Sequence, residues 1–372
     1  MAFGNLNRRH LMVHAALADK TSPLIGNGLE RILNNLEDYD FAVKYIEDNY
    51  SGFPDKVVDS TRSDYESMKT RLHDQIANNG REGWNAFAEY TAWFNDDHLA
   101  VHRYYRDNSG NYIGWTEHFN TRKKCIHYES LMEYKPAPVA CKVTDKTFLI
   151  RFPSCDGKPD GKWILNSVKQ FKKSHCKNLV IDIRGNGGGN DEYWTPYWYL
   201  LYDHESLTPA PEYRNTPSNL AYVQEKGWRV IRYLKELATQ HPDEEYLGYG
   251  FNKSSAKKVD KKVKKAAILI DNHVASSGES MVLALKACSD RVTVFGRDNT
   301  RGCLDYANVA TIAFKNVGYT FQMPMSRIHD VAKNGIDATG IAPDVRIDLP
   351  LPARLTDNID EWVIWVAEQL EK

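Results

Sequence analysis

The feature that most constrains the fold is a pair of apolar segments that each run into a tight turn of small residues. Residues 178–183, Asn-Leu-Val-Ile-Asp-Ile, have the continuous apolar character of a buried parallel strand. Residues 184–189, Arg-Gly-Asn-Gly-Gly-Gly, follow directly, and we refer to them as the glycine turn. Glycine adopts positive φ without strain and lets the backbone approach another group closely. The spacing differs from the GxGxxG fingerprint of dinucleotide-binding loops.

The second apolar segment is residues 267–270, and it leads into Val-Ala-Ser-Ser-Gly-Glu at 274–279, which we refer to as the serine turn. A strand, a tight turn and a helix place a serine hydroxyl at an exposed corner, and the turn's N–H groups face the same space, as a serine nucleophile requires. The alternative is that Ser276 or Ser277 only caps the helix. Two such turns at strand ends favour an α/β fold with a cleft between them.

Three motifs together resemble the family of C-terminal-processing (tail-specific) serine proteases, which includes the tricorn protease core. They are Asp-Ile-Arg-Gly-Asn-Gly-Gly at 182–188, Ala-Ser-Ser-Gly-Glu at 275–279 and Gly-Ile-Ala-Pro-Asp at 340–344, in the family's order. The resemblance covers roughly residues 90 to 350. It implies a crotonase-like core, a peptide or protein substrate, no cofactor, and Ser276 as the nucleophile of a serine peptidase.

The catalytic base has to be sought away from the family's best-known position. In that branch a lysine follows the serine by about 25 residues, whereas residues 296–303 here contain Arg301, and a guanidinium is not a base near neutral pH. The tricorn-like branch uses an early histidine and a late acidic residue, which His98 and Asp337 match. The resemblance therefore implies a Ser276–His98–Asp337 triad.

For the oxyanion we expect one donor from the N–H of Ser277 and another from Gly188 or Gly187. Other interpretations stay open at this stage. The non-catalytic interpretation of His98 is a surface or capping histidine, and that of Asp337 is an aspartate in a turn. Two alternative functions remain for the whole chain. One is a peptide-binding protein that kept the fold without proteolysis, and the other is a crotonase-type acyl-CoA enzyme, for which we find no CoA phosphate site in the sequence.

The chain is predicted to have three parts. Residues 1–95 form a helical N-terminal region, residues 96–350 form the α/β peptidase core, and residues 351–372 form a C-terminal helix. The core includes a β-rich segment at 97–152 and an insertion at 205–265. We find no room for the PDZ domain that family members often carry between the N-terminal helices and the core.

Composition limits the partners. Forty-eight Lys and Arg residues balance 49 Asp and Glu residues, so no nucleic-acid partner is predicted, and the basic run at 257–265 favours a solvated approach to a strand. No apolar run reaches the length of a membrane span. His98 and His102 have an i, i+4 spacing, but no HExxH glutamate accompanies them, so no metal site is predicted.

The six cysteines show no metal-binding spacing and are expected to be buried thiols. Residues 8–18 faintly resemble a signal peptide. The family resemblance favours export, with a cytoplasmic location as the alternative, and the oligomeric state is left open.

Overall fold

The computed structural model describes residues 23–106, 112–119, 137–337, 339–352 and 359–372. The segment at 8–18 and Cys125 lie outside the described residues. The chain divides into two compact units. Of the described residues, 23–94, 99–106, 112–119 and 311–323 belong to the first unit, and 95–98, 137–310, 324–337, 339–352 and 359–372 belong to the second.

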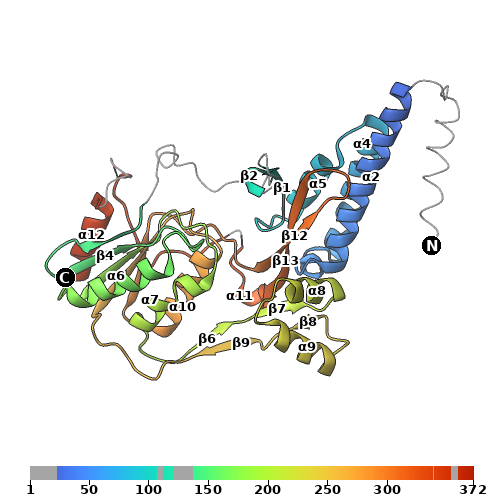
Figure 1. Cartoon of the computed structure of the whole chain (residues 1–372). Helices are drawn as coiled ribbons and strands as arrows, with labels where there is room; N and C mark the ends of the chain where they lie inside the picture. Colours follow the sequence, from blue (N-terminus) through green and yellow to red (C-terminus); the bar gives the residue numbers. More distant parts are fainter. Residues whose placement is uncertain (1–22, 107–111, 120–136, 338, 353–358) are drawn as a thin grey trace. The chain divides into compact units, whose positions relative to one another are not determined.

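Helices make up most of the first unit (Figure 1). They are α2 (Pro23–Asn49), α3 (Phe53–Lys56), α4 (Asp59–Asn79) and α5 (Gly83–Trp93). In α4 the buried residues Tyr65, Met68, Leu72 and Ile76 recur every three or four positions, so they share one face. The helix ends at Gly80, whose φ of 65° is the left-handed conformation typical of a helix C-terminus.

The same unit contains part of an antiparallel sheet. Strand β1 (Ala100–Arg106) pairs with β2 (Tyr112–Phe119) and with the first half of β13 (Tyr319–Ile328). Phe87 of α5 packs on this sheet with its ring centroid 5.0 Å from that of Phe321. The described residues 99–106 and 112–119 thus have their contacts with the N-terminal helices, and the division of the chain given by the sequence stays a prediction.

The second unit is organised around a six-stranded sheet in the order β14-β11-β10-β5-β4-β3. All neighbouring pairs are parallel except β3 with β4. Ile268 of the central strand lies opposite Ile181 on one side and Val294 on the other. The strands are β3 (Val139–Lys142), β4 (Thr147–Arg151), β5 (Asn178–Asp182), β10 (Lys265–Ile270), β11 (Val292–Gly296) and β14 (Val345–Arg346).

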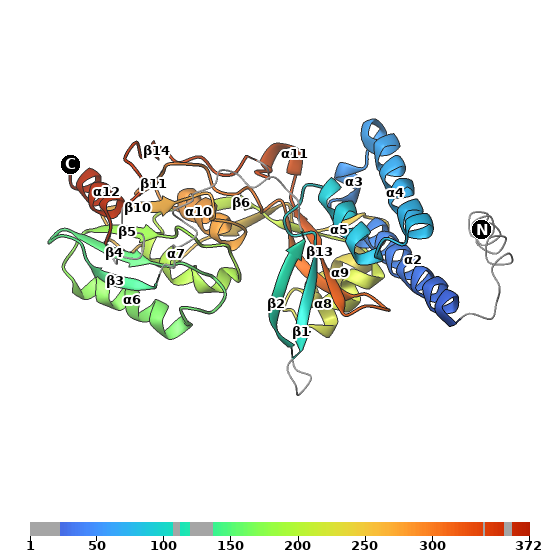
Figure 2. The ribbon, with the colours of Figure 1, turned by 90° about the horizontal axis from the view of Figure 1, so that it is seen from above.

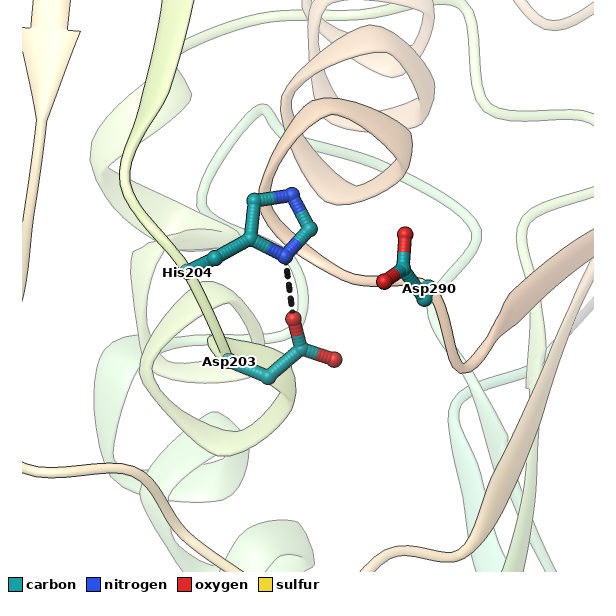
Figure 3. Close-up of side chains that lie close together, drawn as sticks. All are labelled: Asp203, His204 and Asp290. Carbon is teal, nitrogen blue, oxygen red and sulfur yellow. Dashed lines mark hydrogen bonds and ion pairs between the residues drawn. The ribbon is translucent and has the colours of Figure 1, made fainter.

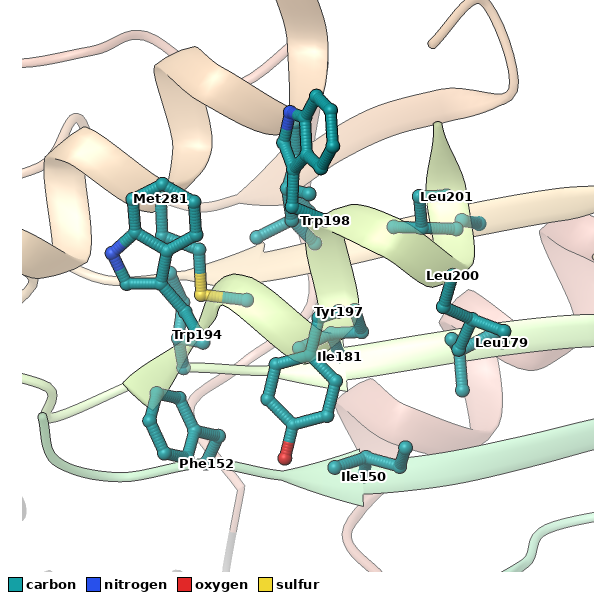
Figure 4. Packing of buried hydrophobic residues seen from close by; sticks show 14 of the residues in the cluster. Ile150, Phe152, Leu179, Ile181, Trp194, Tyr197, Trp198, Leu200, Leu201 and Met281 are labelled. Carbon is teal, nitrogen blue, oxygen red and sulfur yellow. The ribbon is translucent and has the colours of Figure 1, made fainter. Parts of the chain in front are cut away.

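The sheet buries both of its faces, which explains its continuous apolar strands. Because side chains alternate along a strand, Leu179 and Ile181 point to one face and Val180 to the other. Figure 4 shows the first face, where Trp194, Tyr197 and their neighbours pack on the strands. Helices α6 (Gly161–Lys173), α7 (Thr195–Leu201) and α10 (Ser277–Cys288) contribute to this core, and α12 (Glu361–Glu371) covers the opposite face (Figure 2).

A buried ion network ties β5 to α12. Asp182 accepts hydrogen bonds from Arg151 Nε and Arg184 Nη2, each at 2.7 Å, and Arg184 also reaches Asp360 at 2.7 Å. Burial opposes ionisation of Asp182, but the two guanidinium groups lower its pKa to about 2. Asp360 caps α12 by accepting the N–H of Trp362. The Asp-x-Arg of the glycine-turn motif thus anchors the C-terminal helix.

The insertion forms two small antiparallel pairs and two helices. Strand β6 (Ser206–Pro209) pairs with β9 (Phe251–Ser254), and β7 (Pro211–Arg214) pairs with β8 (Tyr246–Leu247) and with the second half of β13. Helices α8 (Pro217–Glu225) and α9 (Ile231–Gln240) lie between β7 and β8 in sequence. The predicted mixed α/β fold is confirmed. Among the described residues, no helix has the length and apolar character needed to cross a bilayer.

Candidate active site

The glycine turn and the serine turn lie against each other at the carboxyl ends of β5 and β10. Ala275 donates its backbone N–H to the carbonyl oxygen of Asn186 at 3.0 Å. A Cβ at position 188 would lie 2.8 Å from the Cβ of Ser276, which no side chain tolerates. Gly188 also has a φ of 105°. Glycine at this position therefore provides both the close approach and the backbone conformation.

Ser276 occupies the corner between β10 and α10. Its backbone angles, φ 53° and ψ −120°, fall outside the regions that a serine normally adopts. Such strain is typical of nucleophile turns, where it exposes the hydroxyl above a strand end. The backbone N–H of Ser276 is held by the carbonyl oxygen of Cys303 at 3.0 Å and by Glu279 Oε2 at 3.1 Å. The surrounding hydrogen bonds thus maintain the strained conformation.

His98 lies directly beside this serine. Its Nε2 is 3.1 Å from Ser276 Oγ, and its Nδ1 is 2.7 Å from the carbonyl oxygen of Tyr306. A carbonyl oxygen only accepts hydrogen bonds, so Nδ1 carries the proton and Nε2 presents its lone pair to the serine hydroxyl. This is the tautomer that a general base needs. The His98 main-chain N–H also donates to Asp96 Oδ1 at 2.9 Å, which fixes the start of the segment.

Asp337 does not make the predicted contact with His98. Its Oδ1 instead accepts the backbone N–H groups of Leu304 and Asp305 at 2.9 and 3.0 Å. Asp305 reciprocates by accepting the N–H groups of Ile336 and Asp337 at 2.7 and 2.9 Å. Two loops are therefore locked together by exchanged carboxylate–amide bonds. The imidazole Nδ1 of His98 is bonded to a backbone carbonyl, that of Tyr306, and not to Asp337.

The surroundings of Asp337 are acidic as well as desolvated. Burial, reinforced by the neighbouring carboxylates of Asp96 and Asp305, raises the pKa of Asp337 to about 8. The two backbone N–H groups favour the charged form but only partly offset these effects. Asp337 therefore gains and loses a proton in the range where a peptidase is ordinarily assayed.

The expected oxyanion donors divide into two groups. Gly188 gives its N–H to the side-chain Oδ1 of Asn186 at 3.0 Å, so this donor is already occupied. Within the part of the chain that the structure describes, no acceptor is hydrogen-bonded to the N–H of Gly187 or of Ser277. A Cβ at Gly187 would meet nothing within 4 Å, so its surroundings are open. Gly187 and Ser277 are thus the pair with N–H groups available to an oxyanion.

Glu279 joins the serine turn to the loop that faces His98. This buried carboxylate accepts hydrogen bonds from Thr300 Oγ1, Gly302 N and Cys303 N at 2.6, 2.7 and 2.8 Å, in addition to Ser276 N. Burial raises its pKa, against the effect of these four donors. The sequence motif contains Glu279, but its four donors are not recognisable in sequence because three of them lie 21 to 24 residues away.

Cys303 is a second group that sequence reasoning did not place here. Its Sγ lies 3.5 Å from His98 Nδ1 and 3.8 Å from Nε2. Burial, reinforced by the carboxylates of Asp96 and Asp97, raises the pKa of this thiol well above its ordinary value. A thiol is a nucleophile only as the thiolate, so Cys303 packs against the imidazole as a neutral group and does not compete with Ser276.

One group among the described residues has metal-ligand chemistry, and it lies at the opposite end of α10 from Ser276. Figure 3 shows Asp203, His204 and Asp290 together. Both His204 nitrogens are already engaged, Nδ1 with Asp203 at 2.5 Å and Nε2 with the carbonyl oxygen of Ala287 at 3.1 Å. Arg291 also bonds Asp203 at 3.1 Å, and a guanidinium beside a carboxylate competes with a cation. These contacts are typical of a cluster that stabilises the C-terminal end of α10.

Comparison with known proteins identifies the family. The model of peptidase family S41 matches residues 146–347, which is more than half of the chain and includes both turns. A search of curated proteins finds no match. Among solved structures, a candidate peptidase from Parabacteroides merdae is 17% identical with a TM-score of 0.57, and the match covers 84% of this chain and 89% of that one.

Mature CPAF complexed with lactacystin is 12% identical with a TM-score of 0.61, over 92% of this chain and 97% of that one. Mature CPAF in a second structure gives 13% identity and the same TM-score, over 92% and 96% of the two chains. At such identities these likenesses establish a shared fold, while the family model covers the glycine turn, the serine turn and Asp337 but begins after His98. The chain belongs to peptidase family S41, as its resemblance to the C-terminal-processing proteases predicts, and it is a serine-type peptidase.

Proposed function

We propose that Ser276 and His98 form the catalytic pair that hydrolyses peptide bonds in peptide or protein substrates. The observation that carries this proposal is the 3.1 Å separation between Ser276 Oγ and His98 Nε2, with His98 Nδ1 held by a carbonyl oxygen. Oγ attacks the scissile carbonyl carbon while its proton passes to Nε2. The imidazolium then gives that proton to the amine nitrogen as the C–N bond breaks. Water attacks the resulting ester by the same route and frees the serine.

The oxyanion of each tetrahedral intermediate is assigned to the N–H groups of Gly187 and Ser277. Support comes from their lack of another acceptor among the described residues and from the position of Ser277 immediately after the nucleophile. Gly188 has a different part in the proposal. Its N–H is bonded to Asn186, so its contribution is the absence of a side chain beside Ser276. An oxyanion site of this kind typically contributes about 10² to 10³ in rate for each donor.

The carbonyl oxygen of Tyr306 takes the orienting part that the resemblance assigns to Asp337. It holds the Nδ1 proton and so fixes the tautomer of His98. Asp337 acts one step further out, because it fixes the backbone at Leu304 and Asp305 just before Tyr306. A carboxylate that directs a loop rather than the imidazole is expected to contribute less to turnover.

We also place the second unit among crotonase-like cores, since its sheet carries both turns at the carboxyl ends of adjacent parallel strands. The alternatives are not favoured. A non-proteolytic binding protein rests on the missing lysine, but His98 occupies the position of a base. An acyl-CoA enzyme is not favoured by the match to a peptidase family.

A fluorophosphonate probe tests the proposal, because it labels only serines that are activated. The wild-type chain is treated with the probe, digested and analysed by mass spectrometry. We expect a single modified serine at Ser276, loss of labelling in Ser276→Ala, and strongly reduced labelling in His98→Ala. Labelling that persists in Ser276→Ala at another serine would contradict the assignment of the nucleophile.

A further inference from the structure

A carboxylate beside the active site has no part in the mechanism described so far. Asp191 follows the glycine turn by two residues and opens a short 3-10 helix at Asp191–Tyr193. Its Oδ1 accepts the hydroxyl of Ser277 at 2.5 Å, and its Oδ2 accepts the hydroxyl of Ser280 at 2.8 Å. One aspartate thus binds two serines of the first turn of α10, beginning at the residue immediately after the nucleophile.

Trp194 strengthens the same connection. Its indole Nε1 lies 3.2 Å from Asp191 Oδ1 and 3.2 Å from the hydroxyl oxygen of Ser277. The indole ring belongs to the hydrophobic core beneath α10, where Figure 4 shows it with Met281. The side chain of Ser277 is therefore held by a carboxylate and by a buried indole. A residue anchored in this way keeps the direction of its backbone N–H.

On its other side, Asp191 is joined to the glycine turn through a rigid segment. Cys155 donates its N–H to the carbonyl oxygen of Gly188 at 3.0 Å and accepts the N–H of Asn190 at 2.9 Å. A Cβ at Gly189 would lie 2.2 Å from the Cys155 carbonyl oxygen, so the two strands of backbone are in direct contact. The short path from Gly187 to Asp191 has little freedom to move, and Asp191 fastens its end to Ser277.

We propose that Asp191 is a positioning residue that sets the distance between the two oxyanion donors, Gly187 N–H and Ser277 N–H. The two donors come from segments that are 90 residues apart in sequence; Asp191 follows Gly187 in one segment, and its carboxylate accepts the hydroxyl of Ser277 in the other. An oxyanion site works only when its donors are fixed before the charge develops, since reorganisation during the reaction would cancel the gain. The placement of a negative charge at the start of α10 also suits the helix dipole.

This inference rests on the proposed Ser276 mechanism, and two measurements separate them. The first is hydrogen exchange of backbone amides in the wild type, Asp191→Ala and Asp191→Asn. It reports on the connection itself without requiring activity. The control is Glu192→Ala, because Glu192 is the neighbouring carboxylate and its side chain is bonded to the exposed Arg229 at 3.4 Å rather than to α10. We expect faster exchange at 185–195 and 274–280 in Asp191→Ala, and wild-type exchange in the control.

The second measurement is the rate of fluorophosphonate labelling at Ser276 together with kcat and KM. Misplacing a donor by a fraction of an ångström lowers kcat roughly 10- to 100-fold, with KM nearly unchanged. Asp191→Asn should recover much of the rate, because its amide still accepts from Ser277 and can donate to Ser280 Oγ.

The outcomes are distinguishable. Unchanged exchange in Asp191→Ala overturns the inference, and so does increased exchange with a wild-type labelling rate, since the contact would then be purely structural. A wild-type chain that is not labelled at all overturns the proposed function and this inference with it. Faster exchange, a lower kcat and recovery by Asp191→Asn support the inference.

Discussion

The serine turn and the histidine segment meet in one 3.1 Å contact, but they are built in opposite ways. Ser276 lies in a single local unit, in which β10, the turn and α10 follow one another along the chain, although its backbone N–H is also held by Cys303. His98 is positioned by segments far apart in sequence, since its imidazole is held by Tyr306, and the loop before Tyr306 is held in turn by Asp337. A nucleophile can therefore be recognised from a local pattern, whereas its base depends on the assembled fold.

The two regions also differ in their carboxylates. Glu279 accepts four hydrogen bonds and links the serine turn to residues 300–303. Asp337 accepts two backbone N–H groups and faces other acids, which together with burial raise its pKa to about 8. The carboxylate of Glu279 at the serine turn thus has four hydrogen-bond donors, whereas Asp337 lies among other carboxylates. We expect the region around Asp337 to be the more sensitive of the two to pH.

The largest effect is expected at Ser276, the residue that lies in the local strand–turn–helix unit. Ser276→Ala should reduce peptidase turnover by roughly 10⁴ or more, because no other group supplies the nucleophile. Ser277→Ala keeps the backbone N–H and loses only the hydroxyl bonded to Asp191, so its loss should stay near tenfold. Steady-state kinetics on a peptide substrate and circular dichroism of both variants check this. A reversed order of the two variants would move the nucleophile to Ser277.

The next-largest effect is expected at His98, whose position depends on contacts between distant segments. His98→Ala should be nearly as damaging as Ser276→Ala, and the double variant should be little worse than either, because the two groups act as one unit. The control is His241→Ala, an exposed histidine at the end of α9. Turnover of the single and double variants is measured under identical conditions. Additive losses in the double variant would show that His98 is not the base of Ser276.

A smaller effect sharpens the comparison where the two turns touch. Gly188→Ala should lower turnover by roughly 10² to 10³, because the new methyl group would push against Ser276 and disturb the donor at Ser277. The matched variant is Gly187→Ala, where the methyl group meets open space and the N–H is retained. We expect its loss to be well below that of Gly188→Ala. Equal losses in both variants would remove the steric explanation.

The smallest effect concerns pH and stability. Asp337 has a folded pKa of about 8, against about 4 in an unfolded chain. A raised folded pKa contributes stability below about pH 4, and this contribution is lost as the pH rises through about 8. Thermal unfolding between pH 5 and 9 should therefore show a steeper fall in Tm for the wild type than for Asp337→Asn.

Asp330→Asn, at an exposed position of the neighbouring segment, is the control and should follow the wild type. Because the side-chain Oδ1 of Asp337 is bonded to Leu304 and Asp305 rather than to His98, Asp337→Asn should cost turnover about tenfold at most, far less than His98→Ala. Parallel Tm curves for the wild type and Asp337→Asn would mean that Asp337 does not titrate in this range.

Residue order alone determined the parts of this protein that are local. The alternation and continuity of apolar residues predicted the buried parallel strands at 178–183 and 267–270, and the small residues after them predicted both turns. The motif match selected Ser276 because strand, turn and helix are consecutive in sequence, whereas the strained backbone of Ser276 is maintained by its bond to the distant Cys303. The same signals were sufficient to indicate a serine peptidase and an α/β fold.

The tertiary structure decided which groups complete the site. Tyr306 contributes a backbone carbonyl, which every residue possesses and no sequence pattern marks. Asp337 was expected beside His98 from its position in a motif. In the structure its carboxylate instead accepts the backbone N–H groups of Leu304 and Asp305. Gly187 and Gly188 are equivalent in sequence, and only the folded turn shows which N–H is already bonded. Long-range hydrogen bonding, which depends on chain segments meeting in space, is the physical reason for the differences at Tyr306 and Asp337. The difference between Gly187 and Gly188 depends on the local conformation of the folded turn.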